Sequence, residues 1–183
     1  MSYTHAVFYR AMNLGHRGSP VRGVLEQALR DAGARAVRSF QTNGTVLLDL
    51  EVAGSAEALV AAAAPSLAAR AGYAGAGLVR SLDELAAAVE GDPFAVTRDE
   101  RTYRETVTLV DGGAPLPVAL PWTDPRDTLD LVAARPGLVL AVVRGGPGAG
   151  GDPNGHVERL TGGVATTRTL GTVRRLLAAA APD

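Results

Sequence analysis

The sequence contains no cysteine and no lysine among its 183 residues. Without cysteine it can form no disulfide, offers no thiolate to a metal and has no cysteine nucleophile. Without lysine it lacks both the phosphate-binding residue of a Walker-type loop and the amine that forms a Schiff base. All 18 basic residues are therefore arginine. We attribute this usage to a GC-rich genome. The planar guanidinium of arginine also binds phosphate and carboxylate groups better than lysine does, because it can donate two hydrogen bonds to them at once.

Aromatic residues and net charge are also scarce. Aromatics make up 4% of the chain and the formal net charge is −1. A chain with this charge has no general electrostatic field that attracts nucleic acid. The three Phe and four Tyr are too sparse to predict a sheet face that stacks bases. We therefore do not expect nucleic acid as a partner.

No long apolar run is present. The longest, around Leu59 to Leu67, is rich in alanine, is interrupted by Pro65 and is too short to span a bilayer. The first residues lack a basic segment followed by an apolar one, so we expect no signal peptide. The sequence predicts a cytoplasmic protein without a membrane partner.

The first half of the chain is organised around the stretch from Arg38 to Leu50. An Asn-Gly pair between two β-favouring runs predicts a hairpin with a type I′ turn at Asn43 and Gly44. This register places Arg38 opposite Asp49 on the more exposed face. The residues expected to share the buried face are Val37, Val46, Leu48 and Leu50.

Patterning around this hairpin predicts a ferredoxin-like half. The expected elements are a strand over 4–10, a helix over 20–32 capped by Ser19, the hairpin strands over 36–41 and 45–51, a helix from Ser55 kinked or ended by Pro65, a strand over 77–80, and a helix over 82–89 opened by a Ser81/Glu84 capping box. This βαββαβ order indicates an α+β fold in which two helices cover one face of an antiparallel sheet. We assign it to residues 1–95.

Residues 96–183 predict a second, smaller α+β half with a C-terminal helix, compatible with a degraded copy of the first. The expected elements are a strand over 102–110, irregular chain over 112–125, a hairpin of strands 129–133 and 138–144, a Gly/Pro loop over 145–155, a helical turn over 157–160, and a helix over 169–180.

Four short motifs in this order resemble an uncharacterised bacterial family, domain of unknown function 1697. They are Tyr9-Arg10-Ala11-Met12-Asn13-Leu14-Gly15, Phe40-Gln41-Thr42-Asn43-Gly44, Arg80-Ser81-Leu82-Asp83-Glu84-Leu85 leading to Pro93-Phe94, and Thr166-Thr167-Arg168-Thr169-Leu170-Gly171-Thr172-Val173. The resemblance implies a two-part α+β fold of ferredoxin-like type and no established activity. The chain departs from the family pattern at Ala11, at Thr42 to Gly44, and at Thr169 and Leu170.

The best candidate site is a group of polar residues that we call the polar edge. The first two strands of a ferredoxin-like sheet are parallel, so the segments that follow them emerge at the same edge. Guanidinium, amide and hydroxyl groups there would suit an anionic or nucleotide-like ligand. These groups can equally serve the backbone of their own loops. The residues are Arg10, Asn13, Arg17, Gln41, Thr42 and Asn43, with His16 beside them.

Two further motifs are weaker. Thr167 and Arg168 precede the last helix, where the hydroxyl groups can cap it and Arg168 can reach an anion. The segment 146–151 fits G-x-G-x-x-G, but a dinucleotide fingerprint needs a helix directly after it and a later strand with an acidic residue. Because Asp152-Pro153 follows, we interpret this segment as a flexible loop.

The sequence shows no catalytic constellation, cofactor site or metal site. The three histidines are isolated and no serine lies in a nucleophile elbow. We therefore expect a small binding module for an anionic ligand. A nucleic-acid-binding domain, or a structural domain that self-associates through its open sheet face, remains the alternative, and the sequence does not predict an oligomeric state.

Overall fold

The structure is a computed structural model that describes residues 3–50, 55–112, 115–146, 148 and 150–181. The chain divides into two compact units. One comprises Met1–Leu85 together with Leu176–Asp183, and the other comprises Ala86–Arg175. Helices and two antiparallel sheets occur together, so the predicted α+β class is confirmed.

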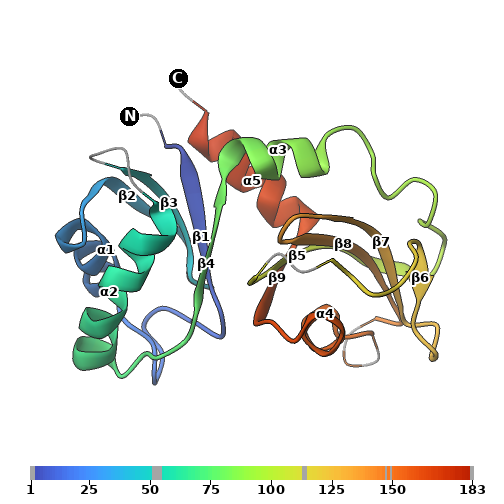
Figure 1. Ribbon diagram of the computed structural model, residues 1–183, viewed down its shortest axis with the longest axis horizontal. Helices are drawn as coiled ribbons and strands as arrows, with labels where there is room; N and C mark the ends of the chain where they lie inside the picture. The colour runs from blue at the N-terminus through green and yellow to red at the C-terminus, as the bar shows by residue number, and fades with distance from the viewer. Residues whose placement is uncertain (1–2, 51–54, 113–114, 147, 149, 182–183) are drawn as a thin grey trace. The chain divides into compact units, whose positions relative to one another are not determined.

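The first unit has the βαββαβ element order that the sequence predicts. Its sheet has the strand order β2-β3-β1-β4, and every neighbouring pair is antiparallel. Figure 1 shows α1 and α2 on the same face of this sheet. The elements are β1 (His5–Tyr9), α1 (Arg22–Asp31), β2 (Ala34–Gln41), β3 (Thr45–Leu50), α2 (Ala56–Ala71), β4 (Gly77–Ser81) and the start of α3 (Leu82–Val89).

The core of the first unit lies between the sheet and these two helices. Leu25 and Leu29 of α1 lie one helical turn apart and are fully buried, as the helical spacing of apolar residues predicts. Val37, Val46 and Leu48 meet them from the hairpin, and Leu50 packs against the same cluster. The predicted buried face of the hairpin is therefore confirmed.

The predicted hairpin register is wrong by two residues. Arg38 lies opposite Leu47, and Asp49 lies opposite Ala36. The cause is a three-residue loop closed by the pair Gln41 and Thr45, together with irregularities in β2. Within this loop only Gly44 has a positive φ, +70°, so the turn is not type I′, which needs a positive φ at two residues. The end predicted at Glu51 lies outside the described residues.

In the first unit, two of the predicted helix starts are confirmed and one is wrong. Ser55 caps α2 by accepting a hydrogen bond from the backbone N–H of Ala58, and Ser81 and Glu84 form the expected capping box. In α1 the N-cap is Val21, without a side-chain bond, because the hydroxyl of Ser19 accepts from a backbone N–H of the preceding loop instead. Pro65 lies inside α2, which continues through it.

The second unit contains a five-stranded sheet of order β6-β7-β8-β5-β9. Both β8 and β9 are antiparallel to β5, so they run parallel to each other on either side of it. The elements are β5 (Thr102–Val110), β6 (Trp122–Thr123), β7 (Leu129–Arg135), β8 (Leu138–Arg144), α4 (Pro153–Thr161), β9 (Ala165–Thr169) and α5 (Leu170–Ala180), whose last residues belong to the first unit.

The interpretation of the glycine-rich segment is wrong in one respect. A helix does follow it directly, because α4 begins at Pro153, whose missing N–H is tolerated in a first helical turn. The segment thus joins β8 to α4, and α4 leads to the parallel strand β9. No acidic residue lies in β9, so the dinucleotide fingerprint remains incomplete. Pro147 and Ala149 lie outside the described residues.

The helix α4 covers one face of the second sheet. Its Val157 is fully buried among Leu131, Ala141 and Ala165, and Trp122 and Leu160 pack at the margin of this cluster. The arrangement is visible in Figure 1. Among the described residues, no helix combines the length and the apolar character needed to cross a membrane.

Candidate functional site

The structure brings the two segments of the polar edge together. The backbone N–H of Leu14 donates to the carbonyl of Thr42 at 2.7 Å, and that of Tyr9 donates to Gly44 at 2.9 Å. The loop after β1 and the turn after β2 therefore meet, as the parallel direction of these strands predicts. Arg80, in β4, lies opposite Ala6 of β1, toward the far end of the sheet.

Several polar side chains of this edge bond within their own turns. The amide of Asn43 donates to the Gln41 side chain at 3.1 Å and accepts from the Thr45 hydroxyl at 2.7 Å. The backbone N–H of Asn13 donates to the Ser19 hydroxyl at 3.0 Å. These bonds stabilise the loop and turn, which is the role that amide and hydroxyl side chains often have there.

The other residues of the polar edge differ in exposure. Arg17 and Thr42 are exposed, and Arg10 is half-buried. The Arg10 backbone is held firmly, because its carbonyl accepts from the Tyr73 hydroxyl at 2.7 Å and its N–H donates to Ala76. A ligand at this edge stays a prediction.

Thr167 and Arg168 point to opposite faces of β9, as neighbouring residues of a strand do. Arg168 is buried and donates to the Thr166 hydroxyl at 3.0 Å. Thr167 bonds the Thr108 hydroxyl at 2.8 Å and the Asn154 side chain at 2.7 Å, and it lines a cavity. The structure thus does not bring this predicted pair together at one site.

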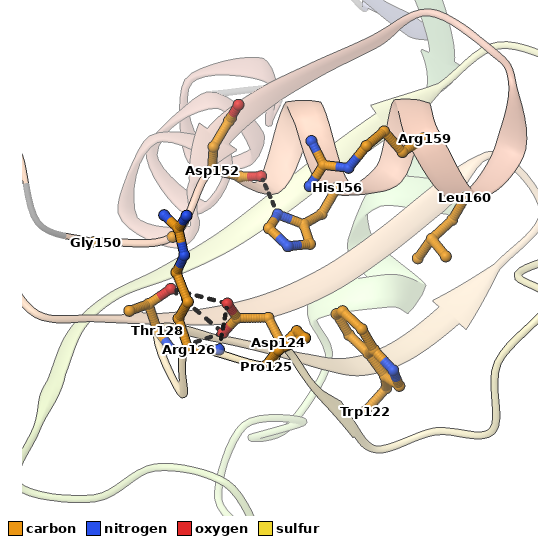
Figure 2. A pocket seen from close by; sticks show the side chains of 11 residues that line it. Trp122, Asp124, Pro125, Arg126, Thr128, Gly150, Asp152, His156, Arg159 and Leu160 are labelled. Carbon is orange, nitrogen blue, oxygen red and sulfur yellow. Dashed lines mark hydrogen bonds between the residues drawn. The ribbon is translucent and has the colours of Figure 1, made fainter.

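A larger cavity of about 680 Å³ opens beside α4 in the second unit. We call it the ring cavity. Its volume lies within the range of small-molecule sites. Figure 2 shows Arg126 and Trp122 on opposite sides of it in this view, with His156 between them above Asp124. The polar and aromatic residues that line it are Trp122, Asp124, Arg126, Thr128, Asp152, His156 and Arg159.

Asp124 fixes the loop that carries Arg126. Its buried carboxylate accepts from the backbone N–H groups of Thr128 and Leu129 at 2.6 and 2.7 Å, and from that of Arg126 at 3.2 Å. Burial alone would raise the pKa of Asp124, but these backbone bonds outweigh it and hold the pKa below its ordinary value. The ionised carboxylate therefore stabilises its own loop by accepting these backbone hydrogen bonds.

Two aromatic rings form one wall of the cavity. The rings of Trp122 and His156 lie 5.8 Å apart between centroids and are inclined by 52°. The Nδ1 atom of His156 lies 3.1 Å from the carbonyl oxygen of Asp152, one helical turn back. When Nδ1 carries a hydrogen it donates to this carbonyl, which leaves Nε2 for another partner.

Arg126 and Arg159 are the cations of the ring cavity. Within the described parts of the chain, neither guanidinium has a hydrogen bond or an ion pair. Other arginines of this unit are committed: Arg144 pairs with Asp130 at 2.5 Å, and Arg101 pairs with Asp127 at 2.5 Å. Two uncommitted guanidinium groups beside two rings can recognise a flat anion.

No sequence motif singles out these residues. The one available signal was the only Trp, which lies four residues before an arginine in a proline-rich segment. The link between this segment and α4 is a tertiary contact that residue types do not predict. Among the described residues, no cluster of three His, Asp or Glu side chains could hold a metal ion.

Comparisons with known proteins support the fold and the family. A solved structure, that of the conserved bacterial protein SP0830 from Streptococcus pneumoniae, superposes with a TM-score of 0.63 at 16% identity, covering 99% of this chain and 100% of that one. This likeness concerns the fold alone. No curated protein matches the chain. The family described as "Protein of unknown function (DUF1697)" matches residues 2–130. The chain therefore belongs to the DUF1697 family.

Proposed function

We propose that this protein is a binding module for a small anionic ligand that carries a flat ring, and that the ligand binds in the ring cavity. The observation that carries the proposal is the convergence of the uncommitted Arg126 and Arg159 on a cavity walled by Trp122 and His156. Such a site suits an aromatic acid or a nucleotide-like metabolite. The absence of cysteine and of a long apolar run suits a cytoplasmic location, which we also propose.

The chemistry of each group supports this assignment. Both rings are half-buried, so each keeps some surface against which a flat ligand can pack. A guanidinium presents planar donors that match a carboxylate or phosphate in two places at once. The negative charge of Asp124 is partly offset by the backbone N–H groups that donate to its carboxylate. Because the carboxylates of Asp124 and Asp152 also line the cavity, an anionic group must contact the guanidinium of Arg126 or Arg159 directly.

The direct test is a thermal-shift screen of aromatic carboxylates and nucleoside monophosphates. A ligand at 100 times its dissociation constant adds about 2.7 kcal/mol to the free energy of unfolding. We expect Arg126→Gln and Arg159→Gln each to reduce the shift. Arg135→Gln is the matched control, because Arg135 is also exposed in this unit but lines a different cavity. A panel without any stabilising ligand, or a shift retained in both variants, would contradict the proposal.

The polar edge is a second candidate for the same class of ligand. The observation that favours it is the contact between the loop after β1 and the turn after β2, which places Arg10 and Thr42 on joined segments. Arg10→Ala tests it in the same screen, with Arg80→Ala at the opposite end of the sheet as its control.

A further inference from the structure

We infer that the ligand of the ring cavity extends across Gly150 and Gly151 into a neighbouring cavity, and that it is a nucleotide rather than a plain aromatic acid. This inference rests on the proposed function and names its ligand class. The neighbouring cavity, which we call the threonine cavity, measures about 460 Å³ and is lined by Tyr103, Arg104, Thr167 and Thr169, among others. Gly150 and Gly151 line both cavities.

The two glycines form the boundary with backbone alone. A Cβ atom on Gly151 would lie 2.6 Å from the Cβ of Leu129, and one on Gly150 would lie 2.8 Å from a methyl group of Val143. Both distances are below van der Waals contact, so this segment packs closely on β7 and β8 only because its residues are glycine. A side chain of any size would push the segment off the strands. The cavities are therefore neighbours separated by one backbone segment.

The threonine cavity offers groups that suit a sugar and a phosphate. The hydroxyl of Thr167 is held by Thr108 and Asn154, which fixes its oxygen while leaving acceptor capacity. The guanidinium of Arg104 lies 4.6 Å above the Tyr103 ring and donates to the Tyr103 hydroxyl at 2.8 Å. Arg104 is exposed and keeps further N–H donors for an anion.

The two cavities together match the parts of a nucleotide. The base has a flat ring for Trp122 and His156 and acceptor atoms for Arg126 and Arg159, the ribose has hydroxyl groups for Thr167, and the phosphate is an anion for Arg104. A benzoate-like acid has a ring and one anionic group, so the ring cavity alone accommodates it. The threonine cavity would then add nothing to its affinity. Sensitivity to the threonine cavity therefore distinguishes the two ligand classes.

The experiment measures dissociation constants by isothermal titration calorimetry for the four common nucleoside monophosphates and for benzoate and indole-3-acetate. The variants are Arg104→Gln and Thr167→Val, with Arg135→Gln as the control. We expect each of the two variants to weaken nucleotide binding by roughly three- to tenfold, the range for one lost hydrogen bond, and to leave the acids unchanged. Arg104 is exposed, so its variant keeps the test valid if Thr167→Val folds poorly.

The outcomes separate this inference from the proposed function. Nucleotides that bind equally well to wild type and to both variants would overturn the inference and leave the proposed function standing. Aromatic acids that bind when no nucleotide does would have the same meaning. If no member of either class binds, the proposed function itself fails.

Discussion

The polar edge of the first unit and the ring cavity of the second contain similar residue types but use them differently. At the polar edge the amides of Asn43 and Gln41 bond to each other within their turn. In the ring cavity the guanidinium groups of Arg126 and Arg159 have no partner among the described residues. Polar composition therefore identifies loops, whereas the hydrogen bonds that each side chain already makes decide whether it is available to a ligand.

The largest loss of stability is expected for a substitution in the turn of the polar edge. Gly44 has φ +70°, and a Cβ there would lie 2.7 Å from the Cβ of Met12. Gly44→Val therefore combines left-handed strain with overpacking, at about 2–5 kcal/mol of unfolding free energy. Chemical denaturation measures this loss.

Two variants calibrate that result. Gly18→Val meets only the strain, since φ is +74° and a Cβ there has open space, so we expect about 1–2 kcal/mol. Thr45→Val loses one buried hydroxyl bond, at about 1 kcal/mol. Equal losses for Gly44→Val and Gly18→Val would show that close packing at the turn contributes nothing.

The next largest loss of stability is expected for a substitution of Asp124, which lines the ring cavity. Asp124→Asn removes the charge that accepts backbone bonds from Thr128 and Leu129, and should cost about 1.5–3 kcal/mol at neutral pH. Because the folded-state pKa of Asp124 is lowered, its contribution is present above the unfolded-state pKa and is lost as the pH falls through the folded-state value. The gap between wild type and variant should thus close in acid.

Urea titrations at several pH values measure this gap. Asp127→Asn is the matched control, because Asp127 lies in the same loop but its side chain is half exposed, so its ion pair contributes at most about 1 kcal/mol. A gap for Asp124→Asn that stays constant from neutral to acid pH would show that the carboxylate charge has no role in holding the loop.

The smallest expected losses of stability test the hairpin register. The buried Asp49 carboxylate accepts from Arg35 at 2.7 Å and from the Thr4 hydroxyl at 3.1 Å. Arg35 is largely exposed, so Arg35→Gln should cost no more than about 1 kcal/mol. Arg38→Gln should cost less, and a larger loss for Arg38 in a denaturation series would favour the register predicted from the sequence.

Local patterns predicted the elements well because their causes are local. The capping box at Ser81 and the apolar spacing of Leu25 and Leu29 depend on residues three or four apart. The predicted hairpin register is wrong because the loop has three residues and β2 is irregular. An Asn-Gly pair alone does not reveal either feature. The start of α4 was missed because Asp152-Pro153 resembles a turn as much as a helix start.

The sites differ in the same way. The meeting of the β1 and β2 segments follows from strand direction, so the sequence could predict the polar edge. The ring cavity joins Trp122 and Arg126 to His156 and Arg159, which lie far apart in the sequence, through the packing of α4 on the sheet. No pattern along the chain marks that contact. Its residues come together only through the fold of the second unit.

One calorimetric series tests the polar edge and the ring cavity for ligand binding side by side. The same nucleoside monophosphates and aromatic acids are titrated into wild type, Arg126→Gln, Arg159→Gln and Arg10→Ala, with Arg135→Gln as the control. We expect Arg126→Gln and Arg159→Gln each to weaken binding by about tenfold or more, as expected for a lost charged hydrogen bond, and Arg10→Ala to bind like wild type. If Arg10→Ala abolishes binding and the other two variants leave it intact, the ligand binds at the polar edge and the proposed site in the ring cavity is wrong.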